Sequence, residues 1–174
     1  MIKLYKKIGI NFYYQEAWRD GNKVVLHSGT VGSTGNKLKR HKWDDCLDLN
    51  ENLMKWLHPA IENGFTEIKD DEKFTLVVEY KTDDKSTDYL SQRHKLEDML
   101  NEHLGWTALG HVDGGSIGSG TMEIFCIVVD YEQAKQSIDY RLSTPEYEEH
   151  KNFNRIYQME LNPSTPSNPW WKIW

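Results

Sequence analysis

Apolar and polar positions follow two different periods along this chain. Residues 2–8 and 11–18 are short runs rich in β-branched and aromatic residues, and residues 23–27 return after Asp20-Gly21-Asn22, a strong hairpin signal. Residues 74–80 (FTLVVEY) and 121–130 (TMEIFCIVVD) are nearly unbroken apolar runs, as strands covered on both faces require. We therefore expect a β-meander at the start of the chain and two central strands in its second half.

Helical spacing predicts three helices between these strands. Asn50 and Gly64 are the expected caps of the first, over residues 50–61, and Pro59 implies either a kink or a later start because proline removes a backbone donor. Asp88 or Thr87 is the expected N-cap of the second helix, Gly105 its end, and the third covers residues 131–142. The apolar residues expected to face the core are Leu53, Trp56, Leu57, Ala60, Ile61, Tyr89, Leu96, Met99, Leu100, Leu104, Ala134, Ile138 and Leu142.

A glycine-rich run at residues 113–120 precedes the most apolar segment of the chain. Glycines permit positive φ and a tight reversal, so residues 106–112 are expected to fold back antiparallel on residues 121–130. With a last strand at residues 153–160, the order becomes β-α-β-β-α-β, the ferredoxin-like arrangement. Its first and third strands lie in the centre of the sheet, which suits the two most apolar runs, and its edges suit the two mixed runs.

The glycines of the first part follow a recognisable order. A strand leads into Gly29, Val31, Gly32 and Gly35, a helix follows, and the sequence Gly-Phe-Thr-Glu-Ile at residues 64–68 closes the unit. This order resembles the WGR domain, which is found in poly-ADP-ribose polymerases and in small bacterial proteins. Ser28 and Thr30 stand where that family has a tryptophan and an arginine that serve contacts to DNA ends. The resemblance therefore implies the WGR scaffold without those two side chains.

Together these patterns predict an α+β protein of two domains and a tail. Residues 1–71 form the WGR-like domain, residues 72–160 the ferredoxin-like domain, and residues 161–174 a proline- and tryptophan-rich tail. Three tryptophans left in water would form a sticky surface, so Trp170, Trp171 and Trp174 are expected to dock on either domain or on a partner chain.

The net charge of the chain limits the classes of partner that it can bind. The net charge of −6 argues against a partner bound chiefly through its phosphates, because such binding needs a basic surface. The one basic cluster, Lys37, Lys39, Arg40 and Lys42, is followed by Asp44 and Asp45. We expect a solvated linker there, with contact to phosphates or to an acidic partner as the alternative.

Two sets of residues are candidate sites. Backbone N–H groups in the run at residues 113–120, with the hydroxyls of Ser116 and Ser119, can cradle an anion, although a wide hairpin or bulge explains the glycines better. His111 and Asp113 lie two apart, so they face one side of a strand, and Glu123 can join them across the hairpin. Such a cluster can bind a metal or transfer protons, but polar residues on an edge strand explain it better.

No nucleophile motif, phosphate loop, dinucleotide fingerprint or thiolate spacing is present, so we expect neither an enzyme nor a cofactor. Cys46 and Cys126 are expected to be free thiols, and without a long apolar run the protein is expected to be soluble and cytoplasmic. The favoured hypothesis is a non-enzymatic interaction protein that binds another macromolecule, in one form an acidic immunity protein that inhibits a basic toxin.

Two alternatives remain open. WGR-type nucleic-acid binding would use Lys37, Lys39, Arg40 and Lys42, and a small-ligand regulatory role would use residues 113–120. Self-association through an exposed sheet edge or through the tail is compatible with each hypothesis.

Overall fold

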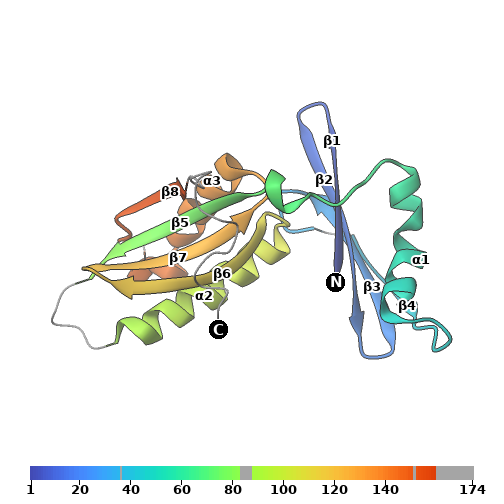
Figure 1. Cartoon of the computed structure of the whole chain (residues 1–174), viewed down its shortest axis with the longest axis horizontal. Coiled ribbons are helices and arrows are strands. Elements are labelled where there is room, and N and C mark those ends of the chain that lie inside the picture. Colours follow the sequence, from blue (N-terminus) through green and yellow to red (C-terminus); the bar gives the residue numbers. More distant parts are fainter. Residues whose placement is uncertain (36, 83–87, 151, 160–174) are drawn as a thin grey trace.

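The computed structural model describes residues 1–35, 37–82, 88–150 and 152–159. Within these ranges the chain forms two four-stranded antiparallel sheets and three α-helices, so the expected α+β class is confirmed. The first sheet (sheet A) and the second sheet (sheet B) belong to the first and second halves of the chain (Figure 1). The tail with Trp170, Trp171 and Trp174 lies outside the described residues.

Sheet A is the expected meander, with one strand more than the sequence pattern predicts. Its strands are β1 (Ile2–Ile8), β2 (Asn11–Asp20), β3 (Lys23–Thr30) and β4 (Lys37–Lys42), in the order β1-β2-β3-β4. The expectation of a linker at residues 37–42 is wrong, because β4 pairs with β3 from Lys23↔Lys42 to Ser28↔Lys37. As an edge strand with little burial, β4 needs no apolar alternation.

Helix α1 (Leu49–Glu62) packs on one face of sheet A. Its N-cap is Asp48 rather than Asn50, because the Asp48 carboxylate accepts a hydrogen bond from the third helical N–H in a capping box. Pro59 lies inside the helix, so the helix does not begin later. Gly64 follows the C-cap with φ of +80°, which confirms the expected glycine stop signal.

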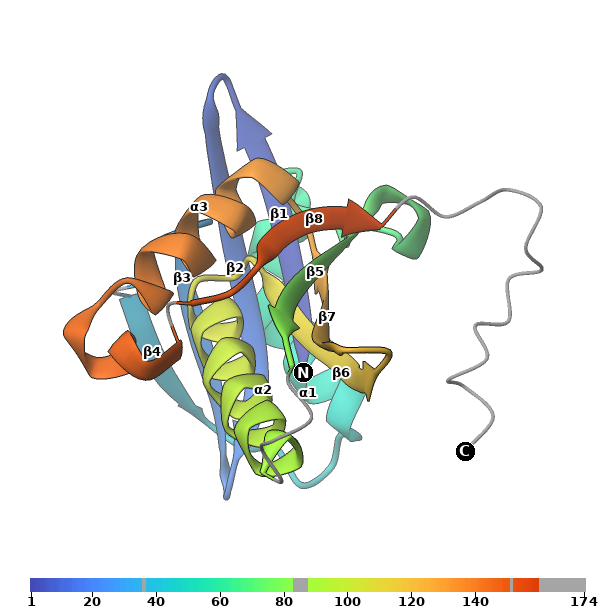
Figure 2. The same ribbon diagram turned by 90° about the vertical axis from the view of Figure 1, so that its left-hand side faces the viewer.

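Sheet B contains the two most apolar segments side by side, as expected. Its strands are β5 (Phe74–Lys81), β6 (Gly110–Gly118), β7 (Thr121–Val128) and β8 (Arg155–Met159), in the order β6-β7-β5-β8. Helices α2 (Tyr89–Trp106) and α3 (Tyr131–Leu142) cover one face (Figure 2). Two short 3₁₀ helices, η1 (Asp70–Glu72) and η2 (Pro145–His150), complete the described elements.

The expectation that these central strands are covered on both faces fits β5, where residues 76–80 are all buried, but not β7. Along β7, side chains alternate between buried and half-buried, and within the described ranges no helix lies on the second face. Glu79 and Glu123 occupy that face, opposite each other on β5 and β7. The second face is thus a semi-polar surface, although Val77 on it is fully buried.

The boundaries of the β6–β7 hairpin differ from those expected. Helix α2 continues past Gly105 to Trp106, and β6 begins only at Gly110 and includes most of the glycine run. The chain reverses at Ser119 and Gly120, whose φ angles are +52° and +81°. The expected bulge is confirmed, since the pairing with β7 shifts between Val112 and Gly114.

Sheet A packs against other elements on both faces. One face holds a small apolar cluster with α1, which includes Leu4, Ala17 and Val24. On the other face, Tyr5 and Tyr14 belong to the same core as the helices and strands of sheet B. Sheet A therefore stands between α1 and the second half of the molecule (Figure 1). The boundary between domains at residue 71 stays a prediction.

Candidate functional site

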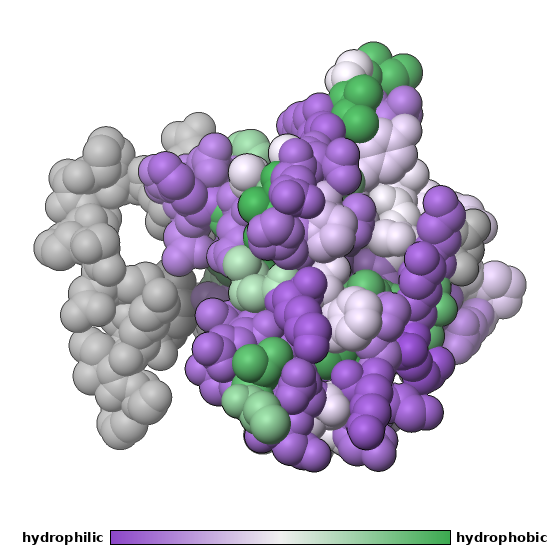
Figure 3. Space-filling model, turned by 90° about the vertical axis from the view of Figure 1, so that its right-hand side faces the viewer, coloured by the Kyte–Doolittle hydropathy of each residue, from purple (hydrophilic) through white to green (hydrophobic). Residues whose placement is uncertain are grey.

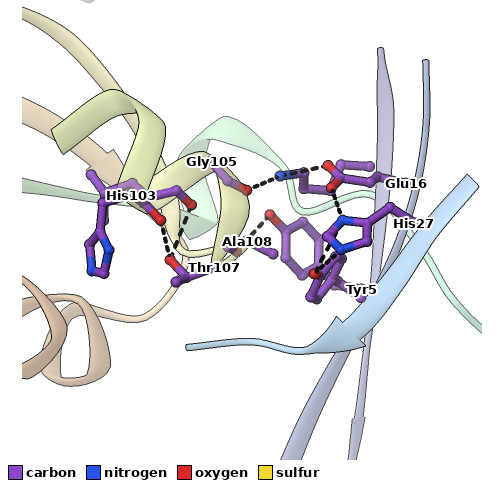
Figure 4. A network of polar contacts seen from close by, with 10 residues as sticks. Tyr5, Glu16, His27, His103, Gly105, Thr107 and Ala108 are labelled. Carbon is purple, nitrogen blue, oxygen red and sulfur yellow. Dashed lines mark hydrogen bonds and ion pairs between the residues drawn. The ribbon is translucent and has the colours of Figure 1, made fainter. Parts of the chain in front are cut away.

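The last turn of α2 and the residues after it dock on the face of sheet A that is opposite α1. Three hydrogen bonds cross this junction. Lys3 Nζ donates to the carbonyl of Gly105 at 3.1 Å, and the Tyr5 hydroxyl donates to the carbonyl of Ala108 at 3.2 Å (Figure 4). The Gly32 N–H donates to the carbonyl of Thr107 at 2.9 Å. The lysine also meets the negative end of the helix dipole.

A chain of polar side chains lies beneath this junction. The Glu16 carboxylate is 2.8 Å from Lys3 Nζ through one oxygen and 2.8 Å from His27 Nδ1 through the other. An ionised carboxylate only accepts hydrogen bonds, so this geometry puts a proton on Nδ1. The Tyr14 hydroxyl lies 3.3 Å from the His27 ring nitrogens. Glu16 and His27 are both buried, and Lys3 balances the charge of the Glu16 carboxylate.

Tyr5 and Tyr14, next to these polar side chains, act as neutral hydrogen-bond donors. Burial, with a contribution from the charge of Glu16, raises the pKa of Tyr14 to about 12. The same two causes raise the pKa of Tyr5 further. Both hydroxyls therefore stay protonated across the physiological range and can donate hydrogen bonds there.

Two tryptophans from distant parts of the chain meet at the edge of the junction. Trp18 of β2 and Trp106 of α2 lie edge to face, with 6.4 Å between ring centroids, and the His27 ring is 5.4 Å from Trp106. Trp106 is nevertheless 43% exposed. The rings border a hollow of about 360 Å³, here called the junction hollow, whose other lining residues are Met1, Lys3, Glu16, Asn101, Glu102 and Gly105.

A second hollow lies on the α1 side of sheet A. It has a volume of about 470 Å³ and is lined largely by hydroxyl and amide side chains, so we call it the hydroxyl hollow. Its lining residues are Ile8, Tyr13, Tyr14, Gln15, Ser28, Gly29, Thr30, Ser33, Thr34, Gly35, Lys37 and Phe65.

The acidic cluster expected on the β6–β7 hairpin does not assemble. Glu123 pairs with Ser116 and accepts hydrogen bonds from the Ser116 hydroxyl at 3.0 Å and the Tyr157 hydroxyl at 2.9 Å. His111 pairs instead with Ile127, and Asp113 lies at the bulge. Among the described residues no group of three His, Cys, Asp or Glu side chains could hold a metal ion.

The other expected site residues are spread over two surfaces. Ser119 lies in the β6–β7 turn, while Ser116 lies within β6 with its hydroxyl on a carboxylate, so the run does not form an open anion loop. The four basic residues all lie on the exposed edge strand β4, Lys37 and Lys39 on one face of sheet A and Arg40 and Lys42 on the other. Within the described ranges, Arg40 is the one of the four that forms an ion pair, at 3.9 Å from Asp20.

The residues of the junction were not singled out by the sequence pattern. Tyr14, Glu16 and Trp18 alternate along β2 and so share one face, and His27 lies opposite Glu16 on β3. The sequence signal that could have indicated this site is Glu16 between two aromatic residues, Tyr14 and Trp18, on one face of a strand. Its burial depends on Trp106 and the end of α2, far along the chain.

Comparison with protein-family models, with curated proteins and with solved structures finds no match. Within the described part of the chain, none of the helices has both the length and the apolar character needed to cross a membrane.

Proposed function

We propose that this is a non-catalytic protein-binding module in which a WGR-like unit and a ferredoxin-like unit are joined through the junction. The strand order β6-β7-β5-β8, with α2 and α3 on one face, supports the ferredoxin-like assignment. For the WGR-like unit, the support is a four-stranded meander, a helix, and a closing segment in which Thr66 bridges to Tyr5 of β1.

The observation that carries the proposal is the junction hollow. Trp106 is exposed at its border although an apolar core lies close by, and Trp18 faces it edge to face. Hollows bordered by tryptophan are the places where a partner's anchoring side chain is fully desolvated, and tryptophan is enriched among residues that dominate binding energies. Glu102 at the border adds a carboxylate for a basic group beside the anchor.

The partner we propose is a basic protein. With a net charge of −6 the chain attracts such a partner over a long range, which raises the rate of encounter. An inhibitor encoded beside a basic nuclease-type toxin is the specific form of this proposal. The net charge steers the encounter, and the apolar hollow sets how long the complex lasts.

Co-purification with the products of neighbouring genes tests the proposal at low and moderate salt. A basic protein should be retained by the natural chain, and Trp106→Ala should weaken that complex at least about tenfold, as expected for an interface anchor. Tyr140→Ala is the matched control, because Tyr140 is 73% exposed on α3 and lies outside the junction. Retention of no basic protein, or an equal effect of both variants, would contradict the proposal.

The geometry of β4 favours nucleic-acid binding as a second candidate. Lys37, Lys39, Arg40 and Lys42 are all exposed along one edge strand, an arrangement that the sequence pattern alone did not predict. Fluorescence anisotropy with DNA ends and with RNA should then show an affinity that falls with salt, with a slope of roughly −3 to −4 for four phosphate contacts. Replacing all four residues with alanine should abolish it. Absence of binding at low salt would remove this candidate.

A further inference from the structure

Helix α1 covers only part of its face of sheet A. Beneath the helix the strands present apolar residues, among them Ala17 and Val24. Further along the same face the side chains turn polar, in cross-strand rows that the pairing fixes: Gln15, Ser28 and Lys37 in one row, and Tyr13 and Thr30 in the next. In the space-filling view from this side, an apolar tip at the β1–β2 hairpin stands above a mainly hydrophilic surface (Figure 3).

The polar rows are the floor of the hydroxyl hollow. Phe65, just after α1, forms one wall, and the loop with Ser33, Thr34 and Gly35 forms another. Gly35 lies so close to Tyr14 and His27 that a Cβ atom there would collide with both side chains. Both side chains point to the junction face, so the loop lies against that side of sheet A and borders the hollow at the end of β3.

The hydrogen-bonding groups on this floor are not used by the protein itself. Among the residues that the structure describes, no partner is found for the side-chain polar groups of Gln15, Ser28 or Thr30. Tyr13, Gln15 and Ser28 are nonetheless only half-exposed. Several converging neutral donors and acceptors therefore lie in a concave site beside aromatic rings.

This lining selects a class of ligand. Lys37 is the one charged side chain among the described lining residues, so a multiply charged ligand would be only partly neutralised there. A purely apolar ligand would leave the hydroxyl and amide groups dehydrated and unpaired. A neutral molecule with many hydroxyls and an apolar ring face satisfies both the polar floor and the aromatic walls.

We propose that the hydroxyl hollow binds a neutral saccharide. One face of a sugar ring packs against Tyr13 and Phe65, and its hydroxyls exchange hydrogen bonds with Gln15, Ser28 and Thr30. The floor of the site lies on the opposite face of sheet A from the junction hollow, so the saccharide site is separate from the proposed protein-binding function and does not depend on it. Small side chains at positions 28 and 30 leave the floor open.

The test is a titration of the full chain, labelled with ¹⁵N, with glucose, N-acetylglucosamine, maltose and cellobiose, preceded by a glycan-array screen for longer neutral glycans. At least one of these saccharides should give saturable shifts centred on the amides of Tyr13, Ser28 and Thr34. Ser28→Trp should weaken binding at least about tenfold, because its indole fills the hollow, and Gln15→Ala about fivefold through loss of hydrogen bonds.

Tyr140→Trp adds an indole at an exposed site on α3 and should leave the affinity unchanged. Gln15→Ala keeps the test valid if Ser28→Trp does not fold. Shifts with none of the saccharides would overturn the proposal. So would displacement of a bound saccharide by inorganic phosphate or by an oligonucleotide at equal concentration, because the hollow would then be an anion site.

Discussion

At the scale of single residues, Glu79 shows how the helix-free face of sheet B holds a charge. Its carboxylate accepts hydrogen bonds from Arg155 at 2.7 and 3.1 Å and from Asn154. These bonds, those of Arg155 first, lower the pKa of Glu79 below its ordinary value of 4.5. The ion pair fixes β8 beside β5 at the end of β5 that lies near the loop to α2.

A lowered pKa in the folded state makes stability depend on pH. The ionised Glu79 stabilises the fold above about pH 4.5, and this stabilisation is lost as the pH falls through the lower folded pKa. Glu79→Gln should therefore reduce the free energy of unfolding at pH 7, and urea titrations should show that the gap to the natural chain closes below pH 4.5. A gap that stays constant down to pH 2 would contradict the assignment.

The two cysteines should differ in reactivity. Burial, with a contribution from Glu97, raises the pKa of the Cys126 thiol to about 12, whereas Cys46 is exposed. Since the thiolate is the reactive form, a thiol reagent at pH 8 should label Cys46 rapidly and Cys126 only after addition of urea. Mass spectrometry of the labelled peptides is the measurement, and rapid native labelling of Cys126 would show that the core of sheet B opens.

At the scale of elements, strand β6 depends on a glycine for its contact with α2. A Cβ atom on Gly115 would overlap the carbonyl oxygen of Glu123 and approach Glu97 Oε1 to 2.8 Å. Arg93 of α2 also donates a hydrogen bond to the Gly115 carbonyl. The glycine run thus serves close packing of helix on strand as well as the turn that its composition suggested.

Gly115→Ala should reduce the free energy of unfolding by about 2 kcal/mol, because the β7 backbone at Glu123 and the Glu97 and Arg93 side chains of α2 must shift. Gly118→Ala is the control on the same strand, where a Cβ atom would meet nothing within 4 Å, and its effect should stay within about 0.5 kcal/mol. Chemical denaturation measures both. Equal effects would mean that strand propensity, rather than the contact with α2, decides the cost.

Helices and strands whose apolar residues recur at a regular spacing were predictable, and those without such a spacing were not. The third helix matches its expected range because Ala134, Ile138 and Leu142 repeat on one face and are fully buried. Strand β4 was missed because KLKRHK shows no apolar alternation, which an exposed edge strand does not need. The start of β6 was misplaced because Trp106, a good strand residue, is held in α2 by its contacts with Trp18 and His27.

At the scale of the whole molecule, a buried network of the side chains of Lys3, Glu16 and His27 helps to hold the two halves together. Lys3 lies between the Glu16 carboxylate and the Gly105 carbonyl, so one side chain joins sheet A to α2. Lys3→Met should reduce the free energy of unfolding by about 3 kcal/mol, because it leaves a buried carboxylate with His27 alone. Urea unfolding followed by tryptophan fluorescence measures this cost.

A double variant separates charge from packing at the same position. Adding Glu16→Gln to Lys3→Met removes the unpaired charge. The free energy of unfolding of the double variant should therefore be at least about 1 kcal/mol higher than that of Lys3→Met alone. If the double variant is no more stable than Lys3→Met, the cost lies in the lost contact with Gly105 instead.

The site could not be predicted as well as the fold, and for a physical reason. Glu16 and His27 are polar residues on strands, which predicts a solvated face. Their burial comes from Trp106 and its neighbours, and no local pattern records a contact across so long a stretch of chain. The basic residues of β4 were found because their proximity is local in sequence.

The double coverage of sheet A has a consequence during synthesis. The four strands and α1 have all been synthesised once residue 62 has been made. The aromatic face with Tyr5, Phe12 and Tyr14, however, packs against residues of the second half of the chain, among them Ala108 and Val129. For the time needed to translate those later residues, the nascent chain presents an open aromatic surface to the cell, and a chaperone that shields it should raise the yield of native protein.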